Sequence, residues 1–163
     1  MNPQKEFLKV LRFQKGLLAC DEVRHYGGRA DILAVDRNKK YIIEYEFKKT
    51  SYDLKHAEMK KSKYGTHKTW YKSWQYCKGK RIKGTVTKKP QTPHKFYFVV
   101  PHELYVKEEV YLKSKKCGVI VYDKKFEFTT MRNCRKKNSN LQKYEVATKN
   151  LLCRLSSAYV NLL

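Results

Sequence analysis

The spacing of hydrophobic and polar residues changes several times in the first fifty positions. Residues 2–15 carry hydrophobic side chains at helical intervals, which predicts a short amphipathic helix. Residues 17–26 and 29–35 are short runs bounded by glycines or turn residues, as is typical of strands. A polar turn follows at 36–39, and residues 40–48 return as a third strand. The N-terminal part is therefore predicted to be one helix followed by three strands.

The middle of the chain departs from this regular pattern. Residues 50–64 have helical spacing and begin with hydroxyl residues suited to an N-cap. Residues 64–95 then contain many lysines, no acidic residue and both tryptophans of the chain. This segment is too long for a plain connection, so we interpret it as an inserted, partly structured element. We expect a helical piece at 69–77 followed by a basic hairpin.

Strand and helix patterns alternate again in the C-terminal half. Residues 95–101 and 117–123 are near-continuous apolar runs, which predict buried strands. Between them, residues 102–114 are predicted to be one helix, and 125–130 an edge strand. A basic stretch at 132–140 leads into a last helix, predicted for 141–163. Strands mixed with helices around a small sheet indicate an α/β architecture, and the 163 residues fit a single domain, 1–163.

Charge is the strongest global signal. The chain has 37 Lys and Arg against 15 Asp and Glu, a formal net charge of +22, so a polyanionic partner is expected, with nucleic acid as the first candidate. No apolar run approaches the roughly 18 residues of a spanning helix, and the N-terminus lacks the apolar stretch of a signal peptide. Five cysteines, odd in number and without a C-x-x-C pair, favour reduced thiols in the cytoplasm. We expect Cys20, Cys117 and Cys153 to lie in the core.

Candidate chemistry gathers on the second and third predicted strands. Glu44, Glu46 and Lys48 share one strand face because residues two apart alternate together. The hairpin turn brings Asp31 alongside them. Hydrolysis of a phosphodiester with Mg²⁺ needs oxygen ligands for the metal and a cation near the attacking water. These residue types supply such parts, while Asp36 is expected to serve only the turn.

The ordered set of motifs resembles the PD-(D/E)XK nuclease superfamily. The matching residues are Asp31 after Ala30, then Glu46-Phe47-Lys48, then a helix. The blocks GGRADILAV, EYEFKKTSYDLK, KFYFVVPHEL and CGVIVYD look like those of a phage and bacterial branch of that superfamily. The resemblance spans roughly residues 17 to 130 and leaves the 64–95 insertion outside it. It implies a restriction-endonuclease-like fold, with a small mixed sheet flanked by helices, in the cytoplasm of a bacterial host cell.

The resemblance also implies roles for individual residues. Asp31 and Glu46 would hold Mg²⁺ or Mn²⁺, and Lys48 would be the catalytic cation. The Phe47 carbonyl and Glu22 would be further metal ligands, and Glu44 would lie in the outer shell of the metal. Ala30 replaces the superfamily's proline, and phenylalanine stands between the glutamate and the lysine. The implied activity is that of an endonuclease, a hydrolase of DNA; many nucleases of this fold act as homodimers.

The basic insertion is the expected nucleic-acid contact. Its cations would neutralise phosphates while its aromatic residues stack on bases or pack beneath the loop. The candidate nucleic-acid-binding residues are Arg29, Lys63, Lys68, Trp70, Lys72, Lys78, Lys80, Arg81 and Lys83. The stretch 132–137 is a second basic segment expected to clamp the backbone.

Other interpretations of the same residues stay open at this point. Asp31 could pair with Arg29, and Glu46 with Lys48 could be an ion pair on a solvated face of an antiparallel sheet. The insertion could be a solvated basic loop. At the level of the whole protein, the alternatives are a non-catalytic nucleic-acid-binding protein that keeps the nuclease fold, and a protein-interaction role for the positive surface.

Overall fold

The computed structural model describes residues 2–25, 28–56, 69–77, 80–88, 93–115 and 117–135, and 145, 147–149 and 151–155 near the C-terminus. At residues 24, 25, 28 and 29 and in the two strands between 69 and 88, only the course of the backbone is described. The predictions for Lys63, Lys68 and Lys78 lie outside the described residues.

A helix opens the chain, as the spacing predicts. Helix α1 (Pro3–Lys9) begins at Asn2, whose side chain accepts a hydrogen bond from the Gln4 backbone N–H at 3.0 Å. It continues directly into a π-helical turn, η1 (Val10–Gln14). Gly16 then takes φ +60°, a left-handed conformation that glycine adopts without strain, and the helical run ends there.

Six strands form one mixed sheet in the order β1-β2-β3-β6-β7-β8. Its strands are β1 (Leu18–His25), β2 (Gly28–Asp36), β3 (Tyr41–Phe47), β6 (Lys95–Pro101), β7 (Gly118–Tyr122) and β8 (Phe128–Arg132). The first three strands pair antiparallel, β3, β6 and β7 pair parallel, and β8 returns antiparallel at the edge. The α/β class and the predicted strands of this sheet are confirmed. Asp36 is a turn residue, as expected, because its Oδ1 accepts the Lys39 N–H at 3.0 Å.

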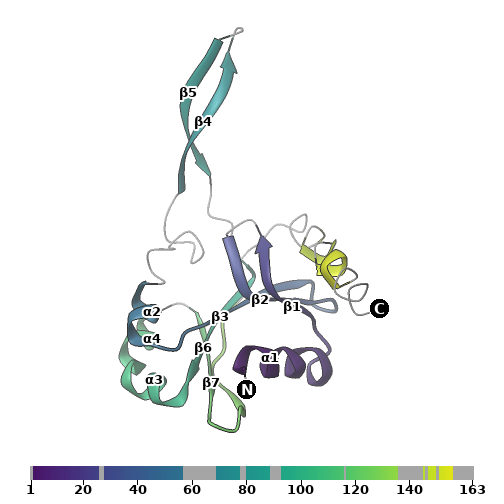
Figure 1. Ribbon diagram of the computed structural model, residues 1–163, viewed down its shortest axis with the longest axis vertical. Coiled ribbons are helices and arrows are strands. Elements are labelled where there is room, and N and C mark those ends of the chain that lie inside the picture. The colour runs from purple at the N-terminus through teal and green to yellow at the C-terminus, as the bar shows by residue number, and fades with distance from the viewer. Residues whose placement is uncertain are drawn as a thin grey trace.

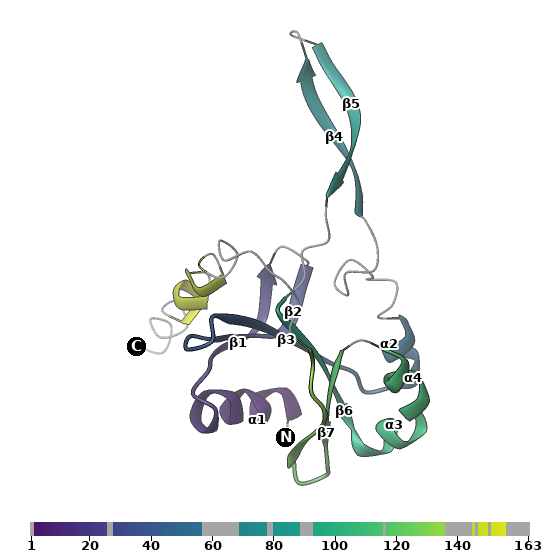
Figure 2. The ribbon, with the colours of Figure 1, turned by 180° about the vertical axis from the view of Figure 1, so that it is seen from behind.

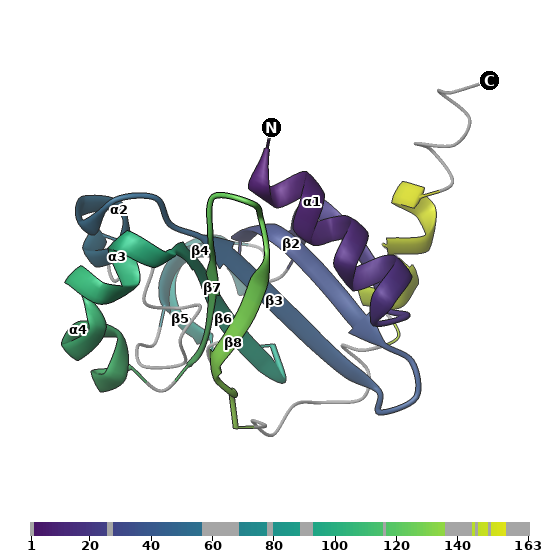
Figure 3. The ribbon, with the colours of Figure 1, turned by 90° about the horizontal axis from the view of Figure 1, so that it is seen from below.

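Helices cover both faces of the sheet (Figure 3). On one face, Phe7 and Leu11 of the N-terminal helix pack on alternate residues of the central strands, among them Tyr45, Tyr97 and Ile120. The other face carries two separate apolar clusters. One lies between β6 and β7 and the short helices α2 (Ser51–His56), α3 (His102–Lys107) and α4 (Glu109–Ser114). The second joins β1, β2 and the start of β3 to residues near the C-terminus.

The predicted single helix over 102–114 is two helices, because it breaks at Glu108. Glu108 has φ −114° and ψ 22°, which is not a helical conformation. Its carboxylate lies 3.1 Å from the Lys55 ammonium of α2. A hydrogen bond from Ser51 and then the bond from Lys55 hold the pKa of Glu108 below its ordinary value. The break therefore provides a polar link between α2 and the two helices beside it.

The prediction of a helical piece at 69–77 is wrong. Strand β4 (Thr69–Cys77) pairs antiparallel with β5 (Lys80–Lys88) along their whole lengths, from Thr69–Lys88 to Cys77–Lys80. The two tryptophans, four residues apart, suit one face of a helix, but they also suit one face of a strand. The resulting ribbon extends away from the six-stranded sheet (Figures 1 and 2). The basic hairpin expected for this segment is present, and it includes the part expected to be helical.

The C-terminal helix is described in part. Residues 145, 147–149 and 151–155 are helical, and Ala147 and Leu151 pack against the face formed by β1 and β2. The rest of the predicted helix over 141–163 lies outside the described residues. Cys20, Cys117 and Cys134 are buried, whereas Cys153 is exposed, so its predicted core position is wrong. Helical spacing turns Cys153 away from Leu151.

Candidate active site

Strand β3 separates apolar from charged residues onto opposite faces of the sheet. Its odd-numbered residues, such as Tyr45 and Phe47, pack beneath α1, where Phe7 meets both rings edge to face. The even-numbered positions carry Glu44 and Glu46, and Lys48 follows the end of the strand. These three residues are 0%, 3% and 6% exposed. The charged row thus runs along the sheet face that also carries the two separate apolar clusters.

Lys48 lies between two carboxylates. Its Nζ is 3.4 Å from Glu46 Oε2 and 3.5 Å from Asp53 Oδ1. The backbone of Lys48 is fixed as well, because its N–H donates to the Val99 carbonyl of the parallel strand β6 at 3.0 Å. The ion pair between Glu46 and Lys48 exists, but its side chains are only 4% and 8% exposed. The alternative of an ion pair on a solvated sheet face is therefore wrong.

Asp31 occupies the position on β2 that the motif requires. The register pairs Leu33 with Glu44 and Ile32 with Tyr45, so the next step along both strands sets Asp31 beside Glu46. Its Oδ2 accepts the Phe47 N–H at 2.8 Å, and its backbone carbonyl accepts from the Gln4 side chain at 2.7 Å. Within the part of the chain that is described, Oδ1 accepts no hydrogen bond. One carboxylate oxygen of Asp31 is thus fixed by the neighbouring strand.

Glu22 lies on β1 at the same level of the sheet. The adjacent pairs are Asp21 with Ile32 and Val23 with Ala30, which places Glu22 across from Asp31. Its φ of +51° is a left-handed conformation that glutamate rarely adopts. Such backbone strain costs on the order of 1–3 kcal/mol and needs support from the surrounding structure. The side chain of Glu22 is exposed, unlike those of Glu44 and Glu46.

The predicted site residues are therefore gathered on three adjacent strands, but they do not form a closed metal cage. Among the described residues, no group of three or more His, Cys, Asp or Glu side chains is arranged to hold a metal ion. Phe47 has its ring in the core, and the role predicted for its carbonyl stays a prediction. Glu44 is fully buried between Leu33 and Phe96, so it is not a surface residue.

Asp53 lies in the first turn of α2 and also reaches the candidate site. Its backbone N–H does take part in the cap, donating to Thr50 Oγ1 at 3.1 Å, but its carboxylate reaches Lys48. The sequence spacing permits this contact but does not predict it, because a residue five positions after the lysine reaches it only if α2 folds back against the end of β3. The half-exposed Asp53 side chain leaves this end of the site open to solvent.

The nucleic-acid-binding assignments stay predictions. The backbone of Trp70, Lys72, Lys80, Arg81 and Lys83 lies on the β4–β5 ribbon, and Arg29 lies on β2. The basic clamp predicted for 132–137 also stays a prediction, and its first residue has a structural role. The Arg132 guanidinium donates to the Lys113 and Cys117 carbonyls, each at 2.9 Å, and also to the Leu112 carbonyl. A side chain that caps the C-terminus of α4 in this way is committed to the fold.

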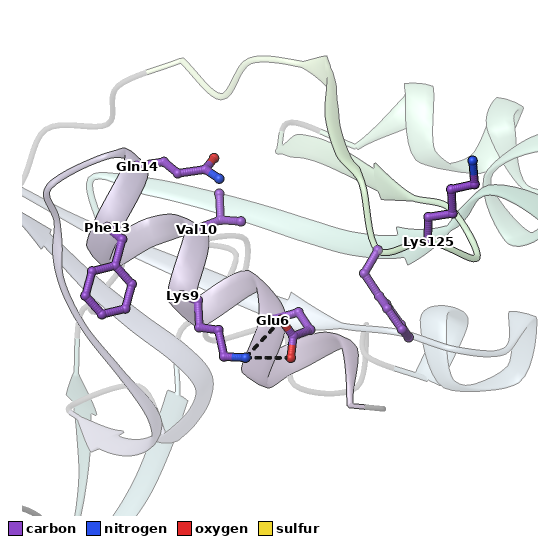
Figure 4. A pocket seen from close by; sticks show the side chains of 7 residues that line it. Glu6, Lys9, Val10, Phe13, Gln14 and Lys125 are labelled. Atoms are coloured by element: carbon purple, nitrogen blue, oxygen red, sulfur yellow. Dashed lines mark hydrogen bonds and ion pairs between the residues drawn. The ribbon is translucent and has the colours of Figure 1, made fainter.

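A pocket of about 390 Å³ lies elsewhere on the molecule. It is formed by one side of α1 and η1 together with the turn after β7, and Figure 4 shows Glu6 paired with Lys9 at its edge. Phe13, which is 84% exposed, and Lys125 also line it. None of the candidate site residues contributes to this pocket.

Comparisons with known proteins bear on the fold. No family model matches the chain, and no curated protein matches it. The chain is similar to one solved structure, described as the SPO1766 protein of unknown function from Silicibacter pomeroyi, with a TM-score of 0.67 and 14% sequence identity. The similarity covers 99% of this chain and 92% of that one. At this identity the likeness concerns the fold alone.

We also compared the helices of the described residues with the length and apolarity of a membrane-spanning helix. Of these helices, none is both long enough and apolar enough to cross a bilayer.

Proposed function

We propose that this protein is a metal-dependent nuclease of PD-(D/E)XK type that hydrolyses phosphodiester bonds of DNA. The observation that carries the proposal is the buried Glu46–Lys48 pair on β3, with Asp31 beside it on β2. A buried ion pair rarely adds net stability compared with apolar residues of similar volume. Two charges kept inside a sheet face are thus better explained by chemistry than by packing.

The donor set suits a hard cation. Asp31 offers one carboxylate oxygen and Glu46 offers another, and Mg²⁺ in nucleotide chemistry usually takes one or two carboxylates together with waters and substrate phosphate. Such a site needs no cage of three acidic side chains before substrate arrives. When bound there, Mg²⁺ or Mn²⁺ would supply a more acidic water and a charge close to the scissile phosphate. Glu22, Glu44 and the Phe47 carbonyl stay secondary candidates, in the ligand or outer-shell roles stated above.

The protein's own groups would hold and neutralise the reactants. Lys48, placed between Glu46 and Asp53, would donate hydrogen bonds to the attacking water or to the phosphate oxygens. Asp53 would keep the ammonium at the solvent side of the buried pair. The formal charge of +22 would attract the polyanionic substrate to the protein.

The test is cleavage of plasmid, linear duplex and single-stranded DNA with Mg²⁺ or Mn²⁺. We expect Asp31→Asn and Lys48→Met to reduce cleavage at least 100-fold. Lys49→Ala is the matched control, because Lys49 is the exposed neighbour of Lys48 and alternation turns it to the other side. Cleavage that is equal in the Asp31 and Lys49 variants would refute the assignment.

A second function is favoured by a specific observation. Because no three-residue metal group exists among the described residues, a non-catalytic nucleic-acid-binding protein with the same fold is the alternative. It predicts salt-sensitive DNA binding together with no heat of Mg²⁺ or Mn²⁺ binding in calorimetry. Metal binding that is lost in Asp31→Asn decides for the nuclease.

A further inference from the structure

The two faces of the β4–β5 ribbon differ in composition. Paired residues of an antiparallel ribbon lie on the same face, and successive pairs alternate between faces. One face therefore carries four successive pairs, each of which contains an aromatic residue, a cation or both. These pairs are Trp70–Thr87, Lys72–Thr85, Trp74–Lys83 and Tyr76–Arg81.

The opposite face has small residues at its central pair and no charged residue in its three middle pairs. Its central pair joins Ser73 to Gly84, and its neighbours are Tyr71–Val86 and Gln75–Ile82. The lysines on this face, Lys80 and Lys88, occupy only the end pairs. The ribbon is thus two-sided, with one face suited to aromatic and ionic contacts along its length.

The ribbon that carries this aromatic face extends away from the six-stranded sheet, as the front and back views show (Figures 1 and 2). A two-stranded ribbon alone is at best marginally stable in water. Pairing of Trp74 with Lys83 and of Tyr76 with Arg81 can support the ribbon, since aromatic residues and cations attract across strands. Trp70, by contrast, is paired with Thr87, which carries no charge.

The spacing of the aromatic residues favours unpaired nucleotides as that partner. Residues on one strand face recur about every 6.7 Å, so Trp70 and Trp74 lie about 13 Å apart along the strand. Bases in a duplex stack on each other and expose only their edges, whereas unpaired bases expose their faces. Stacking of a base on an aromatic side chain contributes about 1–3 kcal/mol and is tolerant of sequence. Reading of duplex edges would use the cations of this face but would leave its tryptophan rings without bases to stack on.

We infer that this face of the β4–β5 ribbon binds unpaired nucleotides of a nucleic-acid strand. Trp70 and Trp74 stack on bases, and Lys72, Arg81 and Lys83 neutralise the phosphates between them. The inference rests on the proposed function, which supplies nucleic acid as the substrate. It specifies the substrate class further, as a nucleic acid with a single-stranded portion that lies along the ribbon.

The test uses the full chain in EDTA, so that no cleavage occurs. The chain has two tryptophans, both on β4, so its intrinsic tryptophan fluorescence reports only on the ribbon. The probes are a 20-nucleotide single-stranded DNA, the same sequence as RNA, and the matching DNA duplex. We expect quenching by the single strands and binding at least 10-fold tighter than to the duplex. The DNA and RNA arms show which sugar is preferred.

Variants separate stacking from general attraction. Trp70→Ala/Trp74→Ala should lose at least 10-fold in single-strand affinity, measured by anisotropy of a labelled strand. Trp70→Phe/Trp74→Phe should lose less than 3-fold because it keeps the rings. Tyr71→Ala, on the opposite face, is the matched control and should bind as wild type. Lys72→Ala should lower the slope of log affinity against log salt by about 0.7.

Two results would overturn the inference. One is single-strand binding without any change in tryptophan emission of the wild-type chain, a readout that does not depend on variant folding. The other is unchanged affinity in the double alanine variant. Failure of the proposed nuclease is distinguishable, because binding in EDTA is measured without cleavage, so the wild-type chain should bind the single strand whether or not it cuts when Mg²⁺ is added.

Discussion

Side chains alternate between two faces both on strand β3 and on the β4–β5 ribbon, but the outcome differs between the two regions. On β3, apolar residues face α1, and the charged row of Glu44, Glu46 and Lys48 is buried on the other side. On the ribbon, cations and aromatic residues alternate onto one face of two strands that extend away from the six-stranded sheet (Figure 1). The same alternation therefore serves a packed layer in one region and a protruding hairpin in the other.

Breaking the buried pair should have the largest effect on stability. Glu46→Leu leaves the buried Lys48 ammonium with Asp53 as its remaining ion-pair partner among the described residues, so we expect the free energy of unfolding to fall by about 3 kcal/mol. Glu46→Leu/Lys48→Met removes both charges and should recover most of that loss. Urea denaturation measures both variants. A single variant as stable as wild type would show that the pair is effectively solvated.

Two glycine-to-alanine substitutions compare how tightly the six-stranded sheet and the ribbon are packed. A Cβ on Gly118 of β7 would overlap the Tyr97 ring, so Gly118→Ala should cost about 1–3 kcal/mol through overpacking. Gly84→Ala, opposite Ser73 on the ribbon, should change stability by less than about 0.5 kcal/mol. Thermal unfolding of the two variants tests the contrast, which equal losses would contradict.

The link between α2 and the helices beside it should be sensitive to acid. The folded pKa of Glu108 lies below its ordinary 4.5, mainly through the hydrogen bond from Ser51 and then that from Lys55. Its contribution to stability is therefore complete above about pH 4.5 and is lost as pH falls through the lower folded pKa. In Glu108→Gln this part of the pH dependence should disappear. Urea unfolding at pH 3 to 6 measures it, and a curve parallel to wild type would contradict the link.

Replacing the ribbon should have the smallest effect on the rest of the molecule. A short Gly-Ser connection in place of 69–88 removes no residue of the three apolar clusters, so we expect a stability change below about 1 kcal/mol. Calorimetry of the shortened chain measures it. A large loss would mean that the ribbon supports the sheet.

Much of the sheet could be predicted because its strands carry their own pattern and turn signals. The apolar runs that became β6 and β7 and the Asp36 turn are of this kind. Residues 69–77 were predicted to be helical because the spacing of Trp70 and Trp74, four residues apart, fits one face of a helix as well as one face of a strand. Pairing with β5 determines that this segment is a strand.

The candidate site could be predicted in part for a related reason. Asp31, Glu46 and Lys48 belong to one local hairpin, so alternation and register suffice to bring them together. The role of Asp53 depends on how α2 folds back after β3, and that of Arg132 on where α4 ends. Such contacts arise from tertiary packing, which the local pattern does not encode.

The parallel pairing of β3 with β6 has a consequence for the order of folding. Strands β1, β2 and β3 are joined by short turns, whereas the bond from the Ile42 N–H to His94 joins residues 52 positions apart. Closing so long a loop costs conformational entropy before any contact repays it. The N-terminal meander can therefore form early, with Asp31 and Glu46 already adjacent. The bond from Lys48 to Val99 must wait for the later strand, so the candidate site is completed only after most of the chain has been synthesised.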